Sequence, residues 1–198
     1  MPISEDGQLT HQAVLAALSQ GKHIPEENSR FCFKVTRSPE IYPMQLVQAK
    51  GIGLPEQCNP INKEICLIED DFLTIKVDVS TSRSVTIFDS EKMPVHKENG
   101  KPLRKDIAIS PTTKQFEHLL TTLMTSSGFQ LVRIMSVGDF HRTNVKKTSS
   151  NFFIPHVEVE LSVSVVNPEL AEKALVLGIG KHRSYGFGFI DVLEHYSV

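Results

Sequence analysis

Apolar residues recur every three or four positions in three segments of the chain, and this spacing predicts three helices. In the first segment, Val14, Leu15 and Leu18 form one apolar stripe, and Gly21 follows as the residue expected just beyond a helix C-terminus. The other two segments begin with serine or asparagine followed by proline, residues preferred at a helix N-cap and in its first turn. The predicted helices span residues 9–20, 110–128 (capped by Ser110) and 167–178 (capped by Asn167).

Elsewhere the apolar residues alternate with polar ones, which is typical of half-buried strands. The segment 156–166 alternates strictly, and 30–37 alternates between apolar and basic residues. The basic stretch 91–105 contains prolines, an asparagine and a glycine, and we predict a long loop or a hairpin tip there. The predicted strands are 30–37, 43–50, 63–80 (one broken strand or two short ones), 84–88, 129–137, 156–166 and 185–194.

The order of these elements predicts an α+β fold made of two tandem ferredoxin-like domains. The second half runs strand, helix, strand, strand, helix, strand, which is the βαββαβ order of a ferredoxin-like or RRM-like domain. The first half has the same order only if its opening strand is absent and its second helix is irregular. We place the first domain at residues 1–82 and the second at residues 83–198.

The composition is that of an ordinary globular protein, since 40% of the 198 residues are apolar and 22% are charged. No apolar run approaches the roughly 20 residues of a membrane span, and the acidic N-terminus is unlike a signal peptide. Three cysteines without CxxC spacing argue against both a disulfide framework and a zinc site. We therefore expect a cytoplasmic protein with no membrane partner, no metal and no cofactor.

Basic residues gather in three clusters of the second half, although the net charge is only −2. A solvated loop explains any single cluster, but three together favour a polyanionic partner such as a nucleic acid. The clusters are Lys92, Lys97, Lys101, Arg104 and Lys105; His141, Arg142, Lys146 and Lys147; and Lys181, His182 and Arg183.

The last cluster lies within GIGKHRSYGFG, residues 178–188, where four glycines surround three basic residues and Tyr185. The segment follows a helix and precedes a strand, the reverse of the order in a phosphate-binding loop, and Arg183 stands where GxGxxG needs its third glycine. A tight turn with positive φ accounts for one or two of these glycines. The alternative is contact with an RNA or DNA backbone, to which Gly178 and Gly180 would present their N–H groups.

A helix beginning NPEL, followed by GIG, a short basic segment, GFG and a final strand, resembles the C-terminal glycine-rich motif of the RAMP proteins of CRISPR systems. Within that superfamily the chain is most similar to the CasE-type endoribonucleases, which process CRISPR repeat RNA in Cascade complexes. The similarity covers nearly the whole chain, including THQAVLAALSQ near the N-terminus and the basic GKPLRKD segment with the helix that follows it.

Metal-independent cleavage of RNA needs a base for the 2′-OH proton, stabilisation of charge at the phosphate and an acid for the leaving 5′-oxygen. Histidine suits either proton-transfer role because its ordinary pKa is close to neutral. The family carries such a histidine on its first helix, and the resemblance places it at His11 of LTHQAV. Helical spacing puts His11 on the same side as Val14, so a partly buried structural histidine is the alternative.

The N-terminal region differs from the family in two ways. Some relatives carry a tyrosine one turn before the histidine, where this chain has Gln8, so a tyrosine-assisted mechanism does not transfer. The family also opens with a strand before this helix, whereas only a short polar segment precedes it here, so either another element fills the sheet position or the first domain is incomplete. His182 is expected to contact RNA, whereas five other histidines are expected to be surface or incidental: His23, His96, His118, His156 and His195.

The resemblance implies an enzyme that binds the hairpin of a CRISPR repeat RNA and cuts at the 3′ side of the stem, leaving a cyclic phosphate and a 5′-OH. His11 would act as general acid or base, and the basic clusters, with Gly178 and Gly180, would contact the RNA. The implied partners are crRNA and other CRISPR-associated proteins of a Cascade-like complex. The alternatives are a non-catalytic RAMP subunit that binds the crRNA handle and a general RRM-like binder, which the absence of paired RNP aromatics disfavours.

Overall fold

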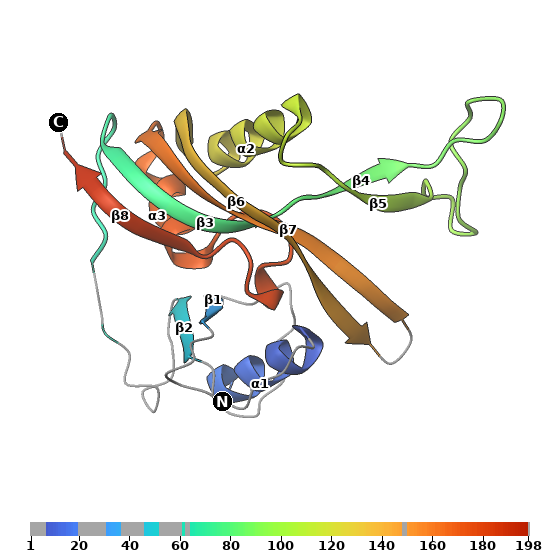
Figure 1. Cartoon of the computed structure of the whole chain (residues 1–198), viewed down its shortest axis with the longest axis horizontal. Helices are drawn as coiled ribbons and strands as arrows, with labels where there is room; N and C mark the ends of the chain where they lie inside the picture. The colour runs from blue at the N-terminus through green and yellow to red at the C-terminus, as the bar shows by residue number, and fades with distance from the viewer. Residues whose placement is uncertain are drawn as a thin grey trace.

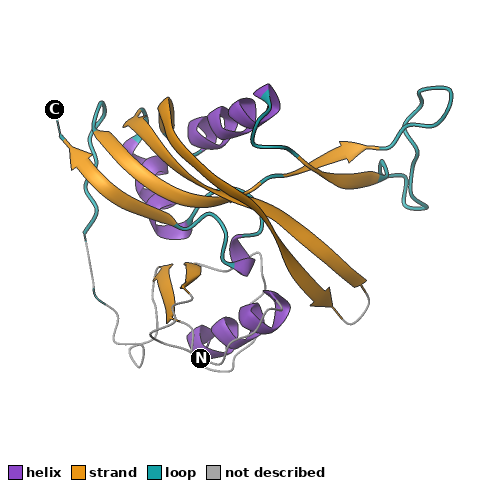
Figure 2. Cartoon of the chain, in the orientation of Figure 1, coloured by secondary structure: helices purple, strands orange, loops and turns teal. Residues whose placement is uncertain are grey.

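The computed structural model of the chain describes residues 7–19, 31–36, 46–51, 61, 64–147 and 150–197. Figures 1 and 2 show the arrangement of helices and strands within these ranges. The helical elements are α1 (Gly7–Ser19), α2 (Lys114–Ser126), α3 (Pro168–Leu177) and the 3₁₀ turn η4 (Arg183–Tyr185). The strands are β1 (Phe31–Thr36), β2 (Leu46–Gly51), β3 (Phe72–Ser80), β4 (Ser82–Thr86), β5 (Arg104–Ala108), β6 (Phe129–Lys147), β7 (Ser150–Val165) and β8 (Ile190–Tyr196).

The largest sheet is four-stranded and antiparallel, in the order β6-β7-β3-β8 (Figure 1). Along the chain its elements run β3, α2, β6, β7, α3, β8, which is the βαββαβ order predicted for the second half. The opening strand is β3, however, and not the predicted strand 84–88, because β4 pairs with β5 in a separate sheet. Since β3 pairs with both β7 and β8, we place the start of the second domain before Phe72 rather than at residue 83.

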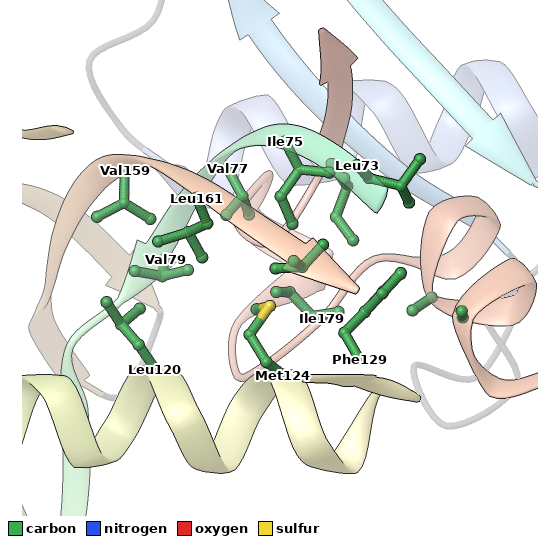
Figure 3. Close-up of a cluster of buried hydrophobic side chains, with 14 of the residues drawn as sticks. Leu73, Ile75, Val77, Val79, Leu120, Met124, Phe129, Val159, Leu161 and Ile179 are labelled. Carbon is green, nitrogen blue, oxygen red and sulfur yellow. The ribbon is translucent and has the colours of Figure 1, made fainter. Parts of the chain in front are cut away.

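One face of this sheet carries the hydrophobic core. Alternate residues of β3 and β7 are apolar and buried, and the antiparallel register sets them opposite one another. Helices α2 and α3 cover this face, and in Figure 3 Leu120 and Met124 of α2 point toward it. Each such side chain stabilises the fold by about 1.5–3 kcal/mol when fully buried, so these rows determine the strand register. The paired residues are Leu73 with Val163, Ile75 with Leu161, Val77 with Val159 and Val79 with Val157.

The ends of the two helices that cover this face match the sequence predictions differently. Helix α3 is capped as predicted, because the Asn167 side chain accepts a hydrogen bond from the Leu170 N–H (3.0 Å). Helix α2 begins at Lys114, four residues later than predicted. Ser110 is not its cap, because the carbonyl of Ser110 accepts from the Thr113 N–H (3.2 Å) and closes a separate turn before the helix.

Two hairpins extend beyond the central sheet. Strands β6 and β7 are both longer than predicted, so the polar segment 141–147 belongs to a strand. Register shifts interrupt the pairing of β6 with β7 at three places. The second hairpin, residues 82–108, consists of β4, β5 and the predicted hairpin tip between them; we call it the arm. It leaves the sheet beside β7, where the Thr81 N–H donates to the Pro155 carbonyl (2.8 Å). Strand β5 was not predicted, because its sequence RKDIA lacks an apolar alternation and every residue is exposed.

His156 joins three strands at the point where the β6–β7 hairpin leaves the sheet. Its Nδ1 hydrogen-bonds the Asp78 carboxylate of β3 (2.9 Å), and its Nε2 hydrogen-bonds the Thr143 hydroxyl of β6 (3.1 Å). Its ring also lies 4.7 Å from the ring of Phe187, centroid to centroid. The side chain is only 13% exposed, so the prediction of an incidental surface histidine is wrong.

The described N-terminal elements are α1 and the antiparallel pair β1–β2, close to the predicted helix 9–20 and strands 30–37 and 43–50. They attach to the second domain near β8: Lys34 of β1 forms an ion pair with Asp191, and the Lys50 ammonium of β2 donates to the Ile190 carbonyl. Both ammonium groups lie over the Phe189 ring, Lys50 at 4.5 Å from its centroid. The predicted absence of an opening strand before α1 concerns residues that lie outside the described ranges.

We predict that His156→Ala lowers the free energy of unfolding by about 1–3 kcal/mol, because it leaves Asp78 and Thr143 without this partner. The measurement is urea unfolding followed by circular dichroism. His118→Ala is the matched control, since His118 is exposed on α2, and we expect a change of less than about 0.5 kcal/mol. Equal effects of the two substitutions would contradict the structural role of His156.

Candidate functional site around His11

His11 lies on α1 with its side chain directed into the protein, and only 4% of the residue is exposed. Val14 is buried on the same helix face, as the helical spacing predicted. The imidazole lies against the ring of Tyr185, with 5.0 Å between the centroids and 40° between the planes. Tyr185 ends η4 within the glycine-rich loop, so residues almost the whole chain apart meet at this point.

Further aromatic side chains surround Tyr185. Phe152 of β7 stands edge-on to it, with ring centroids 6.1 Å apart and planes at 88°, and the His182 ring lies 6.2 Å away. Beneath them a second hydrophobic cluster of Val145, Ile154 and Phe187 is buried. Helix α1, the outer part of the β6–β7 hairpin and the glycine-rich loop therefore converge on one site around His11.

The conformation of the glycine-rich loop explains all four of its glycines, whereas the sequence analysis expected a turn to account for only one or two. Gly178, Gly180, Gly186 and Gly188 have φ values between 73° and 96°, which favour glycine. At Gly188 the chain also crosses Ile179, whose N–H donates to the Gly188 carbonyl (2.9 Å). A side chain at Gly188 would overlap the Ile179 carbonyl oxygen.

The three basic residues of this loop point to three different places. Lys181 donates to the Ser84 hydroxyl of the arm (3.2 Å) and lies 3.7 Å from the Asp106 carboxylate. Arg183 donates to the carbonyls of Leu177 (3.3 Å) and Gly178 (3.5 Å), where a cation stabilises the C-terminal end of α3. Only the His182 ring joins the aromatic group around Tyr185. RNA contact by these three residues stays a prediction, and His182 is the one whose ring lies beside Tyr185.

The two glycines predicted to bind RNA also differ in position. Gly178 is buried, and a side chain there would meet the Gly188 carbonyl oxygen at 2.7 Å, so this glycine serves packing inside the protein. Gly180 is exposed. RNA contact stays a prediction for both glycines, and Gly178 is buried in this conformation.

The other predicted RNA-binding residues lie on the two hairpins. Arg142 and Lys146 are exposed on β6, toward the tip of the β6–β7 hairpin; the side chain of Lys147 lies outside the described residues. The Arg142 guanidinium lies 5.7 Å over the Phe140 ring. The arm exposes five predicted residues over its length: Lys92, Lys97, Lys101, Arg104 and Lys105.

Cys32 of β1 is fully buried beside Gly178 of the glycine-rich loop. Burial raises the pKa of this thiol to about 11, although Lys50 and Arg183 oppose the shift. The thiol is therefore neutral at pH 7, and it donates a hydrogen bond to the Val176 carbonyl (3.3 Å). Cys66 is a free cysteine as well, and the third, Cys58, lies outside the described residues. Within the described ranges, no group of three or more His, Cys, Asp or Glu side chains is placed to hold a metal ion.

One protein-family model, described as CRISPR associated protein, matches residues 3–193. The chain belongs to this family of CRISPR-associated proteins. No curated protein sequence matches it significantly. None of the helices in the described part of this CRISPR-associated protein has the length and apolar character needed to span a bilayer.

Solved structures share the fold of this CRISPR-associated protein at low sequence identity. Thermus thermophilus Cse3, solved with an RNA representing a pre-cleavage complex, is 17% identical with a TM-score of 0.68, and the match covers 96% of this chain and 90% of that one. Cas6e from Escherichia coli K-12 is 16% identical with a TM-score of 0.61, covering 96% and 92%. A chain of a CRISPR RNA-guided surveillance complex is 12% identical with a TM-score of 0.58, covering 96% and 94%.

These matches confirm the predicted α+β fold with two tandem ferredoxin-like domains, and the family model confirms the resemblance to CRISPR-associated proteins. Tyr185, the aromatic residue of the loop, had no role assigned from the sequence. A tyrosine-assisted mechanism was not expected to transfer, because Gln8 stands one turn before His11. The structure brings a tyrosine to His11 from the glycine-rich loop instead.

We predict that Gly188→Ala destabilises the protein much more than Gly100→Ala. Both glycines have φ near 75°, so both substitutions carry the backbone cost of about 1–2 kcal/mol. Gly100 has open space around it, whereas a methyl group at Gly188 would overlap backbone atoms, which raises the expected cost there to at least about 3 kcal/mol. Urea unfolding of both variants tests this, and similar costs would contradict the crossing at Gly188.

Proposed function

We propose that this protein is a metal-independent endoribonuclease that binds the hairpin of a CRISPR repeat RNA and cleaves it at the 3′ side of the stem. The observation that carries the proposal is the meeting of His11 with the glycine-rich loop, beside the outer part of the β6–β7 hairpin and linked through Lys181 to the arm. Both hairpins expose lysine and arginine side chains. The shared fold with Cse3, solved with RNA, and with a chain of a CRISPR RNA-guided surveillance complex supports it. The product would remain bound, with the protein as one subunit of such a complex.

The reaction needs a base for the 2′-OH proton and an acid for the leaving 5′-oxygen; His11 would serve one of these roles and water the other. The 2′-oxygen attacks the adjacent phosphorus, the bond from phosphorus to the 5′-oxygen breaks, and the products carry a 2′,3′-cyclic phosphate and a 5′-OH. His11 takes the proton of the 2′-OH or delivers one to the leaving 5′-oxygen. Because only 4% of the residue is exposed, the RNA would meet the imidazole from one side.

The RNA stem would lie along the two hairpins. Proteins recognise A-form RNA mainly through phosphates, 2′-hydroxyls and shape, and flexible lysine side chains on extended hairpins suit this kind of contact. The arm supplies Lys92, Lys97 and Lys101 near its tip, and β6 supplies Arg142 and Lys146. Lys181, which bonds the arm at Ser84, would join the stem-binding surface to the loop beside His11.

A non-catalytic subunit that holds the crRNA handle is the second candidate. The observation that favours it is the burial of His11, of which only 4% is exposed, because a structural histidine is buried in the same way. The two functions share the RNA-binding surfaces and differ only in whether His11 transfers a proton.

We predict that the protein cleaves a hairpin CRISPR repeat RNA in EDTA, and that His11→Ala slows the reaction by about 10²–10⁴-fold, the usual contribution of a general acid or base. Binding of the RNA, measured by fluorescence anisotropy, should change little. His11→Gln tests the same loss with less change in volume, and His118→Ala is the control on an exposed helix face. Tight binding without cleavage by the wild-type protein would leave the handle-binding subunit as the function.

We predict that Lys101→Ala weakens RNA binding and reduces the slope of log K against log salt by about 0.7–1, the value for one lost phosphate contact. Lys173→Ala is the matched control, because Lys173 is exposed on α3, away from both hairpins. Anisotropy titrations at several salt concentrations give both slopes. An unchanged slope for Lys101→Ala would place the stem elsewhere.

A further inference from the structure

We propose that Tyr185 is a positioning residue for His11, and that it acts through its ring rather than its hydroxyl group. The two rings lie 5.0 Å apart at an angle of 40°, a separation at which aromatic rings pack favourably. The inference rests on the proposed function, because it assigns Tyr185 a role in the same reaction.

The imidazole of His11 needs such a neighbour. The terminal torsion of a histidine side chain has a broad, roughly two-fold distribution, so a free imidazole exchanges the positions of its two nitrogens. Proton transfer requires one particular nitrogen within hydrogen-bond distance of the reacting oxygen. An aromatic ring against one face of the imidazole restricts this rotation, and Tyr185 supplies such a ring.

The surroundings of Tyr185 hold its ring in place. Residues on both sides of η4 have left-handed backbones, with φ of 62° at His182 and 96° at Gly186, which turn the chain sharply around Tyr185. Phe152 stands edge-on to the ring, and Phe187, two residues along, is buried with 4% exposed. A side chain at Gly186 would meet the Phe33 ring at 3.1 Å, so the loop is also pressed against β1. A residue supported on several sides suits a positioning role.

The test is single-turnover cleavage of the hairpin repeat RNA in EDTA, across a range of pH, for wild type, Tyr185→Ala and Tyr185→Phe. We expect Tyr185→Ala to lower the cleavage rate constant by about 10–100-fold, as misplacement of a catalytic group does. The Kd for RNA should stay within about twofold of wild type, since the loss falls on the chemical step. Tyr185→Phe should rescue the rate to within about fivefold, because the ring remains. Tyr196→Ala, an exposed tyrosine of β8, is the control.

A second readout tests the ring contact without cleavage. In the protein labelled with ¹³C at histidine Cε1, the Tyr185 ring current shifts the His11 resonance. Tyr185→Ala should move this resonance toward the position of an exposed histidine, and Tyr185→Phe should leave it near the wild-type position. Thermal unfolding of each variant identifies any general loss of fold.

Each remaining outcome overturns the proposal or the function beneath it. A Tyr185→Phe variant as slow as Tyr185→Ala would assign the role to the hydroxyl group, and a weaker Kd with an unchanged rate constant would make Tyr185 an RNA contact. Full activity of Tyr185→Ala, or an unmoved His11 resonance, would remove its role altogether. If the wild type binds RNA but does not cut it, the proposed function fails, and the His11 resonance still decides whether Tyr185 orients the imidazole.

Discussion

A backbone hydrogen bond from the Gly188 N–H to the Asp78 carbonyl (2.7 Å) ties the glycine-rich loop to β3. Asp78 lies near the end of β3, one residue beyond its last pairing with β8, and its side chain hydrogen-bonds His156. The loop is thereby held to β3 at the place where the β6–β7 hairpin leaves the sheet. The loop residues before Gly188 pack against the outer part of this hairpin, and Tyr185 contacts His11 of the first domain. This hydrogen bond and the crossing of Gly188 with Ile179 together hold the loop in the conformation that places Tyr185 beside His11.

Close crossings of this kind demand glycine, and the basic residues between the glycines then serve different purposes. Arg183 stabilises the end of α3, and Lys181 bonds the arm, so two of the three charges hold protein elements together. The positive charge available for a polyanion lies mainly on the exposed hairpins. A basic run in a sequence is therefore an incomplete guide to a binding surface, because a cation satisfies a helix C-terminus or a neighbouring carboxylate as readily as a phosphate.

Local patterns predicted the elements whose structure depends on near neighbours. The alternation in β7 specifies a strand because every second side chain faces the same core, and the asparagine and proline before α3 cap it by contacts within four residues. Predictions failed where distant segments decide. The predicted strand ended too early for β6, because three register shifts break its alternation. Strand β5 was missed because its residues are all exposed, and within the described residues it pairs with β4 alone. The Ser110 cap failed for a local reason, because the turn from Ser110 to Thr113 closes before the helix begins.

The sequence by itself determined the fold class and the residues of the glycine-rich motif, because these follow from spacing and short-range order. His11 became a candidate through the family resemblance that this motif carries. The tertiary structure alone decided that β3 is the first strand of the four-stranded sheet, that His156 connects three strands and that Tyr185 contacts His11. Those contacts join residues separated by up to most of the chain. No local pattern encodes such contacts, because they arise only when the packing of the sheet and the backbone crossing at Gly188 bring the segments together.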